Sequence, residues 1–227
     1  MEDLLVYGLT FLAFIITSLA QAYITSTYKK YGLVKNSNSM TGREVARKLL
    51  DNNGLKNVDV VEVSGYLSDH YDPSSKVVRL SNSNYNESSI SSVSVAAHEC
   101  GHAIQDKENY SFLRLRASLI PIVNFSSYAG YLAIVIGCFT GIFGLIKLGI
   151  LLECVILFFQ VVTLPVEIDA SKRALSEIKK YNYLDEKEYD SGKSVLRAAA
   201  LTYVAGVATA LIQILRLILV YGRRNKK

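Results

Sequence analysis

The sequence predicts a mainly α-helical integral membrane protein with about four transmembrane helices and a small antiparallel β-sheet. Half of the 227 residues are hydrophobic, and much of this apolar content is concentrated in four long blocks, which is typical of membrane spans. Short valine-rich runs on either side of a turn indicate strands. The net charge of +5 comes from basic residues between the blocks, as expected at a bilayer surface. No basic cluster is interleaved with aromatic residues, so nucleic acid is not an expected partner.

The first apolar block covers residues 4–24 and is long enough to cross a bilayer. The chain starts with the acidic pair Glu2 and Asp3, and neither a basic segment nor a small-residue cleavage site accompanies the block. A removable signal peptide would have both features. We therefore expect a first transmembrane helix that stays attached.

A short amphipathic helix is expected after this span. Thr41 would cap it, and Glu44 stands three residues later, as in a capping box. Apolar residues three and four positions apart would form the buried face. These residues are Val45, Ala46, Leu49 and Leu50.

Residues 58–63 and 76–80 are expected to be short strands. A further strand is expected within residues 65–73, followed by a turn that begins at Asp72 and Pro73. The prediction is an antiparallel sheet of about three strands. The polar residues 81–94 then lead into an apolar helix.

Three more apolar blocks follow, at residues 123–143, 148–164 and 198–215. Pro121 predicts a break before the first of them. Lys147 separates the first two blocks, which we therefore expect to form a tight hairpin. Pro165 should kink the chain where it leaves the bilayer, before two more helices.

The expected organisation therefore has five segments. They are an N-terminal transmembrane helix (1–27), a domain with the small sheet and the apolar helix (28–122), a transmembrane hairpin (123–164), a pair of helices (165–197), and a C-terminal transmembrane helix with a basic tail (198–227).

The apolar helix carries the motif His98-Glu99-x-x-His102, and the chain has only three histidines. Positions four apart lie on one helix face, so the two imidazoles can bind the same Zn²⁺. Glu99 can then act on the open metal position as a general base. Ser89, Ser91 or Ser92 would cap the helix. Gly101 would allow another segment to approach closely.

A catalytic zinc needs a third protein ligand, for which His70 and Glu167 are the candidates. We favour Glu167, because a carboxylate close to the membrane is costly unless it is paired or bound to a metal. The alternative for Glu167 is an ion pair with Lys172 or Arg173.

Two residues close to Glu167, Asp169 and Ser171, could orient a ligand imidazole. Both are also ordinary residues for the first turn of a helix. The strand before the turn could bind an extended peptide substrate along its edge. Its residues are Tyr66, Leu67, Ser68, Asp69 and Tyr71. His70 could stabilise the oxyanion there, although His70 and Tyr71 could equally pack or cap a turn.

At these residues the chain resembles the membrane-bound neutral zinc metallopeptidases of bacteria, often called YugP-like. The resemblance runs nearly end to end and includes residues 67–73, 78–81, 96–105, 163–171 and 198–205. It implies a zincin-like fold related to gluzincin membrane proteases of the CAAX prenyl protease type. Those proteases have aspartate where this chain has Ser171, so Asp169 is a candidate for that role. Cys100 replaces an aliphatic residue that is usual in the family.

We therefore expect a membrane-embedded zinc endopeptidase that binds one Zn²⁺ per chain through His98, His102 and Glu167. Expected partners are the lipid bilayer and a peptide or membrane-protein substrate, whereas the sequence does not define the oligomeric state. The alternative is a catalytically inactive scaffold or adaptor that retains a structural zinc. The intact general base Glu99 favours the enzyme.

Orientation is predicted from the lysines and arginines, which are more numerous on the side of the histidine helix. The positive-inside rule then places the active site at the cytoplasmic face of a multi-pass protein in the bacterial plasma membrane. The basic residues at the C-terminus favour the opposite orientation. The three cysteines form no disulfide pattern, which agrees with a cytoplasmic location.

Overall fold

The computed structural model describes residues 2–224, so Met1 and residues 225–227 of the expected basic tail lie outside the described part. The described residues form two compact units. The span unit contains residues 2–21, 115–164 and 202–224, and the site unit contains Ala22–Arg114 and Pro165–Leu201. Four long helices contribute to both units.

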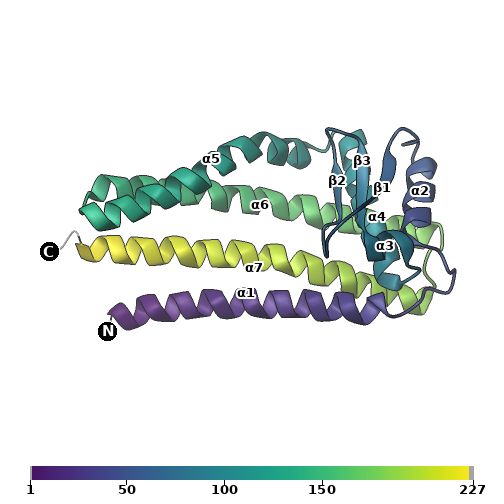
Figure 1. The fold of residues 1–227 in the computed structure, drawn as a ribbon, viewed down its shortest axis with the longest axis horizontal. Coiled ribbons are helices and arrows are strands. Elements are labelled where there is room, and N and C mark those ends of the chain that lie inside the picture. Colours follow the sequence, from purple (N-terminus) through teal and green to yellow (C-terminus); the bar gives the residue numbers. More distant parts are fainter. Residues whose placement is uncertain (1, 225–227) are drawn as a thin grey trace. The chain divides into compact units, whose positions relative to one another are not determined.

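These helices are α1 (Glu2–Gly32), α5 (Ser111–Thr140), α6 (Phe143–Lys180) and α7 (Glu186–Arg224). Each is long and apolar enough to cross a bilayer, which confirms the predicted four spans. In the span unit, α1 begins and α7 ends on the same side as the turn between α5 and α6 (Figure 1). This arrangement is expected when a chain crosses a layer four times.

Several predicted interruptions of these helices are wrong. Pro121 lies within α5 and Pro165 within α6, because a transmembrane helix can tolerate the loss of one backbone hydrogen bond. The amphipathic segment before the last span is likewise continuous with it in α7. The hairpin turns at Gly141, whose φ of +75° suits glycine, and Lys147 lies inside α6.

In the site unit, α2 (Gly42–Asn52) begins with the predicted capping box. The Glu44 backbone N–H donates to the Thr41 hydroxyl, and the Thr41 backbone N–H donates to the Glu44 carboxylate. The predicted apolar face of α2 is fully buried. It packs in one core with residues of the sheet and of α4 (Ile90–Lys107).

The sheet contains β1 (Asp59–Val63), β2 (His70–Asp72) and β3 (Val77–Ser81) in the order β1-β3-β2. β2 pairs antiparallel with β3, but β1 pairs parallel with β3. The prediction of a purely antiparallel sheet is therefore wrong. Successive strands do reverse direction, yet β3 lies between the other two and so has a parallel neighbour.

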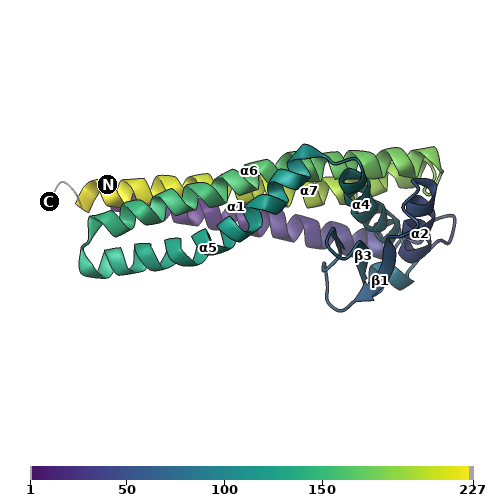
Figure 2. The ribbon, with the colours of Figure 1, turned by 90° about the horizontal axis from the view of Figure 1, so that it is seen from above.

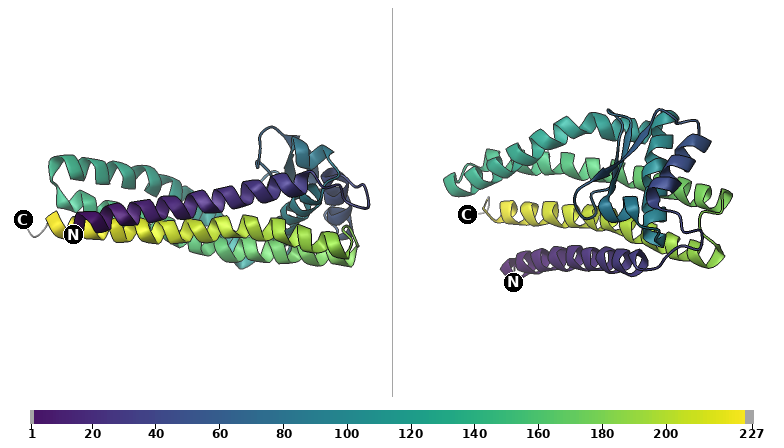
Figure 3. Two further views of the ribbon diagram at one scale, coloured as in Figure 1. Left: turned by 90° about the horizontal axis from the view of Figure 1, so that it is seen from below. Right: turned by 45° about the vertical axis from the view of Figure 1, so that its right-hand side comes forward.

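The helix that carries the histidines, α4, lies beside this sheet (Figures 2 and 3). Ser89 caps it by accepting a hydrogen bond from the Ser92 backbone N–H. Nearly all of α4 is buried, which agrees with its apolar sequence. The short helix α3 (Asn82–Asn86) precedes it and was not predicted, because its sequence is entirely polar apart from Tyr85.

Candidate metal centre

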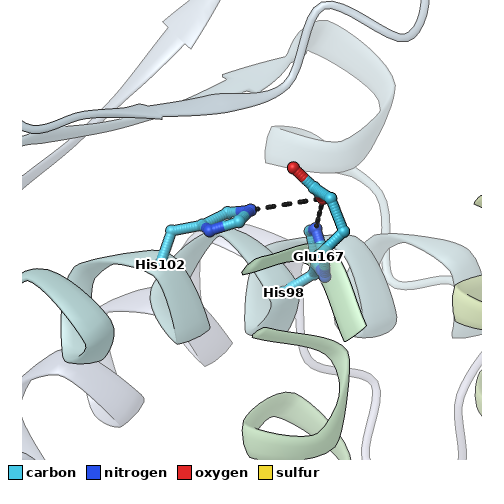
Figure 4. Close-up of side chains that lie close together, drawn as sticks. All are labelled: His98, His102 and Glu167. Carbon is cyan, nitrogen blue, oxygen red and sulfur yellow. Dashed lines mark hydrogen bonds and ion pairs between the residues drawn. The ribbon is translucent and has the colours of Figure 1, made fainter. Parts of the chain in front are cut away.

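The site is built from two helices, since α4 supplies His98 and His102 and α6 supplies Glu167. His98 Nε2 lies 3.2 Å and His102 Nε2 lies 3.5 Å from the same carboxylate oxygen, Glu167 Oε2. All three side chains are largely buried. Figure 4 shows both imidazoles directed toward the Glu167 carboxylate. The structure thus brings Glu167, rather than His70, to the two histidines.

The close approach of α4 and α6 depends on Gly101. A Cβ atom at this position would lie 2.6 Å from the carbonyl oxygen of Ala170, which is a steric clash with backbone. The two helices can therefore pack at this distance only with glycine there. This contact also explains how Glu167 on α6 reaches His98 and His102 on α4.

His102 is oriented by Gln105, one turn further along α4 and fully buried. The Gln105 Nε2 group donates to the Val166 carbonyl and to Asp169, both at 2.8 Å. Its Oε1 atom therefore faces His102 Nδ1, at 3.0 Å, and must accept a hydrogen bond from the Nδ1–H group. This arrangement fixes the tautomer in which His102 Nε2 carries a lone pair toward Glu167.

The hydrogen bonds continue from Gln105 to the surface. Arg173 donates from Nε to Asp169 at 2.5 Å and from Nη1 to Glu108 at 2.6 Å. Asp169 thus bridges Gln105 and Arg173, and does not contact an imidazole directly. We refer to Gln105, Asp169, Arg173 and Glu108 as the Gln105 chain.

His98 has a simpler partner. Its Nδ1 atom lies 3.2 Å from the Ser171 hydroxyl, one turn after Glu167 on α6. Of the two residues expected to orient an imidazole, Ser171 makes a direct contact and Asp169 acts through Gln105. Both nitrogens of each ring are therefore accounted for, with each Nε2 directed toward Glu167.

Glu99 follows His98 on α4 and is 7% exposed. Burial raises the pKa of its carboxyl group to about 7, and the negative charges of Glu167 and Asp69 act in the same direction. His98 and a hydrogen bond from the backbone N–H of Tyr71 oppose this shift. Glu99 is thus a buried carboxyl group that titrates near neutrality beside two histidines.

Residues 66–71, which were expected to bind substrate as an extended strand, are only partly a strand in the structure. Only residues 70–72 form β2, whereas residues 64–67 bend, with a φ of +57° at Leu67. His70 is exposed, and its Nδ1 atom lies 2.8 Å from the Ser68 carbonyl oxygen. It is not in the metal-binding cluster of the described residues. The Tyr71 hydroxyl donates to Asp106 at 2.7 Å.

Asp69 has a structural role in this segment. It accepts hydrogen bonds from the Ser81 backbone N–H at 2.7 Å and from the Asn84 amide at 2.9 Å. These bonds fasten the bend to β3 and α3. Tyr66, by contrast, is exposed and packs edge-on against Tyr28 of α1, with ring centroids 6.4 Å apart.

Sequence reasoning gave no role to two residues around the centre, Gln105 and Tyr28. Tyr28 interacts electrostatically with both Asp69 and Glu99. Arg173 was considered as an ion-pair partner of Glu167, but it pairs with Asp169 and Glu108. The position of Gln105, three residues after His102 on a buried helix, was the available signal. No comparable signal existed for Tyr28, because its approach depends on how α1 packs.

The donor set suits a divalent metal ion. One nitrogen from each histidine and one carboxylate oxygen lie within 4.8 Å of one another. Two imidazoles and one carboxylate match the ligands of a catalytic zinc that keeps one position open. The fixed His102 tautomer adds to this fit, because Nε2 of a neutral imidazole is a metal ligand.

Comparisons with known proteins identify the family of the chain. The family model described as "Putative neutral zinc metallopeptidase" matches residues 6–222. The chain is 44% identical to the "Putative membrane protease YugP" of Bacillus subtilis (strain 168) over 213 residues, which are 94% of this chain and 95% of the relative. No solved structure matches the chain significantly. The chain therefore belongs to this neutral zinc metallopeptidase family, and with its four apolar helices it is a membrane protein.

Proposed function

We propose that the protein is a zinc-dependent endopeptidase of the membrane, with His98, His102 and Glu167 as the ligands of one Zn²⁺. The observation that carries the proposal is the convergence of both Nε2 atoms on the Glu167 carboxylate, with Glu99 next to His98. When bound, zinc would supply Lewis acidity toward a water molecule and the scissile carbonyl group.

Residues of the protein would carry out the proton transfers and position the reacting groups. Glu99 takes a proton from the attacking water and delivers it to the leaving amine. Its pKa near 7 suits both steps, because the group exchanges a proton readily at neutral pH. The Tyr71 backbone N–H, which donates to Glu99, holds the carboxylate in place. Gln105 and Ser171 keep the two imidazoles in the orientation that binds the metal.

The alternative is an inactive scaffold with a structural zinc. Structural zinc sites usually have four protein ligands and no open position. Here the cluster in the described residues has three ligands, and a buried carboxylate adjoins it. These two features favour catalysis.

The test compares the parent protein with Glu99→Gln in detergent or lipid nanodiscs. Glu99 is not a proposed ligand, so the variant should retain about one Zn²⁺ per chain. Its cleavage of a membrane-protein or peptide substrate should fall at least about 100-fold. Equal cleavage by both proteins would overturn the mechanism, and a parent that binds zinc without cleaving any peptide would favour the scaffold.

We further propose that the site unit faces the cytoplasm, because basic residues are more numerous in its segments near the membrane. The test places a cysteine at Asn57, an exposed position of the site unit, in a variant that lacks the three native cysteines. It should react with a membrane-impermeant thiol reagent only after lysis. Labelling in intact cells would place the site outside.

A further inference from the structure

A cavity of about 420 Å³ lies in the site unit between the end of α1, α3 and the start of α4. The residues that matter for its chemistry are Tyr28, Gly32, Leu33, Tyr66, Asn84 and Ser91. Most of its exposed wall is apolar. One lysine and one glutamate also line it, so the lining has no net charge. A neutral, mainly apolar group is therefore the best match for this cavity.

Among the polar groups that line the cavity, the hydroxyl group of Ser91 differs from the others in being buried without a hydrogen-bond partner in the described residues. This side chain is 1% exposed, and its Oγ atom has no hydrogen-bond partner among the described residues. A buried hydroxyl without a partner is unfavourable, so such groups are usually satisfied. Ser94, on the same helix, shows the usual situation, because its hydroxyl donates to the Ile90 carbonyl at 2.7 Å. Ser91 is therefore set up to bond with a ligand.

Two residues that line the cavity also interact with residues at or beside Glu99. Tyr28 lines the cavity and interacts electrostatically with the Glu99 carboxylate. Asn84 also lines it and donates to Asp69, which fastens the bend before β2. Ser91 and Glu99 are eight residues apart on α4, which separates them by about 12 Å along the helix axis.

We propose that this cavity, which we call the Ser91 pocket, is a specificity subsite of the proposed peptidase. It takes a neutral, largely apolar substrate side chain that ends in one hydrogen-bonding group, as the phenol of tyrosine does. The spacing of about 12 Å corresponds to three or four residues of extended peptide. The recognised side chain therefore lies three or four residues from the bond that is cleaved. This inference rests on the proposed function.

The Ser91 hydroxyl provides the selectivity. A site that offers a buried hydrogen-bonding group discriminates against a ligand that lacks the matching group. We expect the parent protein to prefer tyrosine over phenylalanine at this position by about tenfold, as one buried hydrogen bond would give.

The experiment uses the full-length, zinc-loaded protein and peptides that carry tyrosine or phenylalanine three or four residues on either side of the cleaved bond. Cleavage of each peptide by the parent, Ser91→Ala and Ser94→Ala is measured as kcat/KM. The tyrosine preference should fall to about twofold or less in Ser91→Ala, because the bonding hydroxyl is lost. It should persist in Ser94→Ala, the matched control.

Two further measurements exclude a merely structural effect. Ser91→Ala should melt at the same temperature as the parent or higher, since it loses no hydrogen bond, whereas Ser94→Ala should melt lower. Gly32→Leu should reduce cleavage of the tyrosine peptides, because no heavy atom lies within 4 Å of the added Cβ and the side chain can enter the pocket.

The same peptides are also tested for binding to Glu99→Gln, which separates the two proposals. Binding with a tyrosine preference that depends on Ser91, without cleavage by the parent, would support the pocket and overturn the peptidase. Cleavage with the same preference in the parent and Ser91→Ala would overturn the pocket and leave the peptidase intact.

Discussion

His98 and His102 lie one turn apart on α4 and approach the same oxygen of Glu167, yet their Nδ1 atoms have different partners. His98 contacts a single hydroxyl, that of Ser171, at 3.2 Å. His102 contacts Gln105 at 3.0 Å, and Gln105 is itself held by Val166 and Asp169. The hydrogen-bond network is therefore more extensive around His102.

This difference has a physical consequence for metal binding. A hydroxyl can rotate and can donate or accept, so Ser171 leaves the His98 tautomer less constrained. The amide of Gln105 has both of its ends occupied and fixes His102 in one tautomer. We infer that most of the preorganisation of the centre comes from the His102 side, and the following variants test that inference.

The largest effect is expected for Gln105→Leu. The substitution removes the acceptor of His102 Nδ1 and disconnects the Gln105 chain, so zinc affinity should fall by about 10–100-fold. Ser171→Ala, the corresponding change on the His98 side, should lower it by about threefold or less. Chelator competition gives both values. Equal losses would contradict the difference between the two sides.

A smaller effect, of opposite sign, is expected for Ser171→Asp. A carboxylate beside His98 Nδ1 would accept a hydrogen bond from the Nδ1–H group, fix the tautomer and make the ring a better ligand. Zinc affinity should rise by about tenfold, which would make the two sides more alike. The same chelator titration checks the result, and weaker binding would show that His98 already has its best partner.

The smallest effect is expected for Arg173→Met, which removes the ion pairs to Asp169 and Glu108 but leaves Gln105 in place. Zinc affinity should fall by about two- to fivefold, because this residue acts through two others. Lys172→Met is the control, since it removes the same charge from the neighbouring exposed position. A similar loss in both variants would indicate a general effect of charge.

The features that were predictable from the sequence are local ones. The capping box of α2 spans four residues, each apolar block lies within one helix, and the two histidines are one turn apart. Such patterns depend on the period of a helix, which the sequence shows directly. The four spans and the α4 motif were therefore recognisable before any tertiary contact was known.

The features that were missed depend on packing between distant segments. The parallel pairing of β1 with β3 follows from the order of strands, which periodicity does not encode. Gln105 meets Asp169, 64 residues later, only because Gly101 lets α6 approach α4. Pro121 predicted a break and Pro165 a kink before a separate helix, but α5 and α6 are continuous through these residues, since local propensity is a weak constraint within a packed or membrane helix.

The zinc content of purified variants tests the central claim most directly. If His98, His102 and Glu167 bind the metal, the parent should carry about one Zn²⁺ per chain, and Glu167→Ala should lose most of it to a competing chelator. His70→Ala should bind zinc as the parent does, since His70 is exposed and outside the cluster. Full zinc retention in Glu167→Ala, together with loss in His70→Ala, would contradict this account.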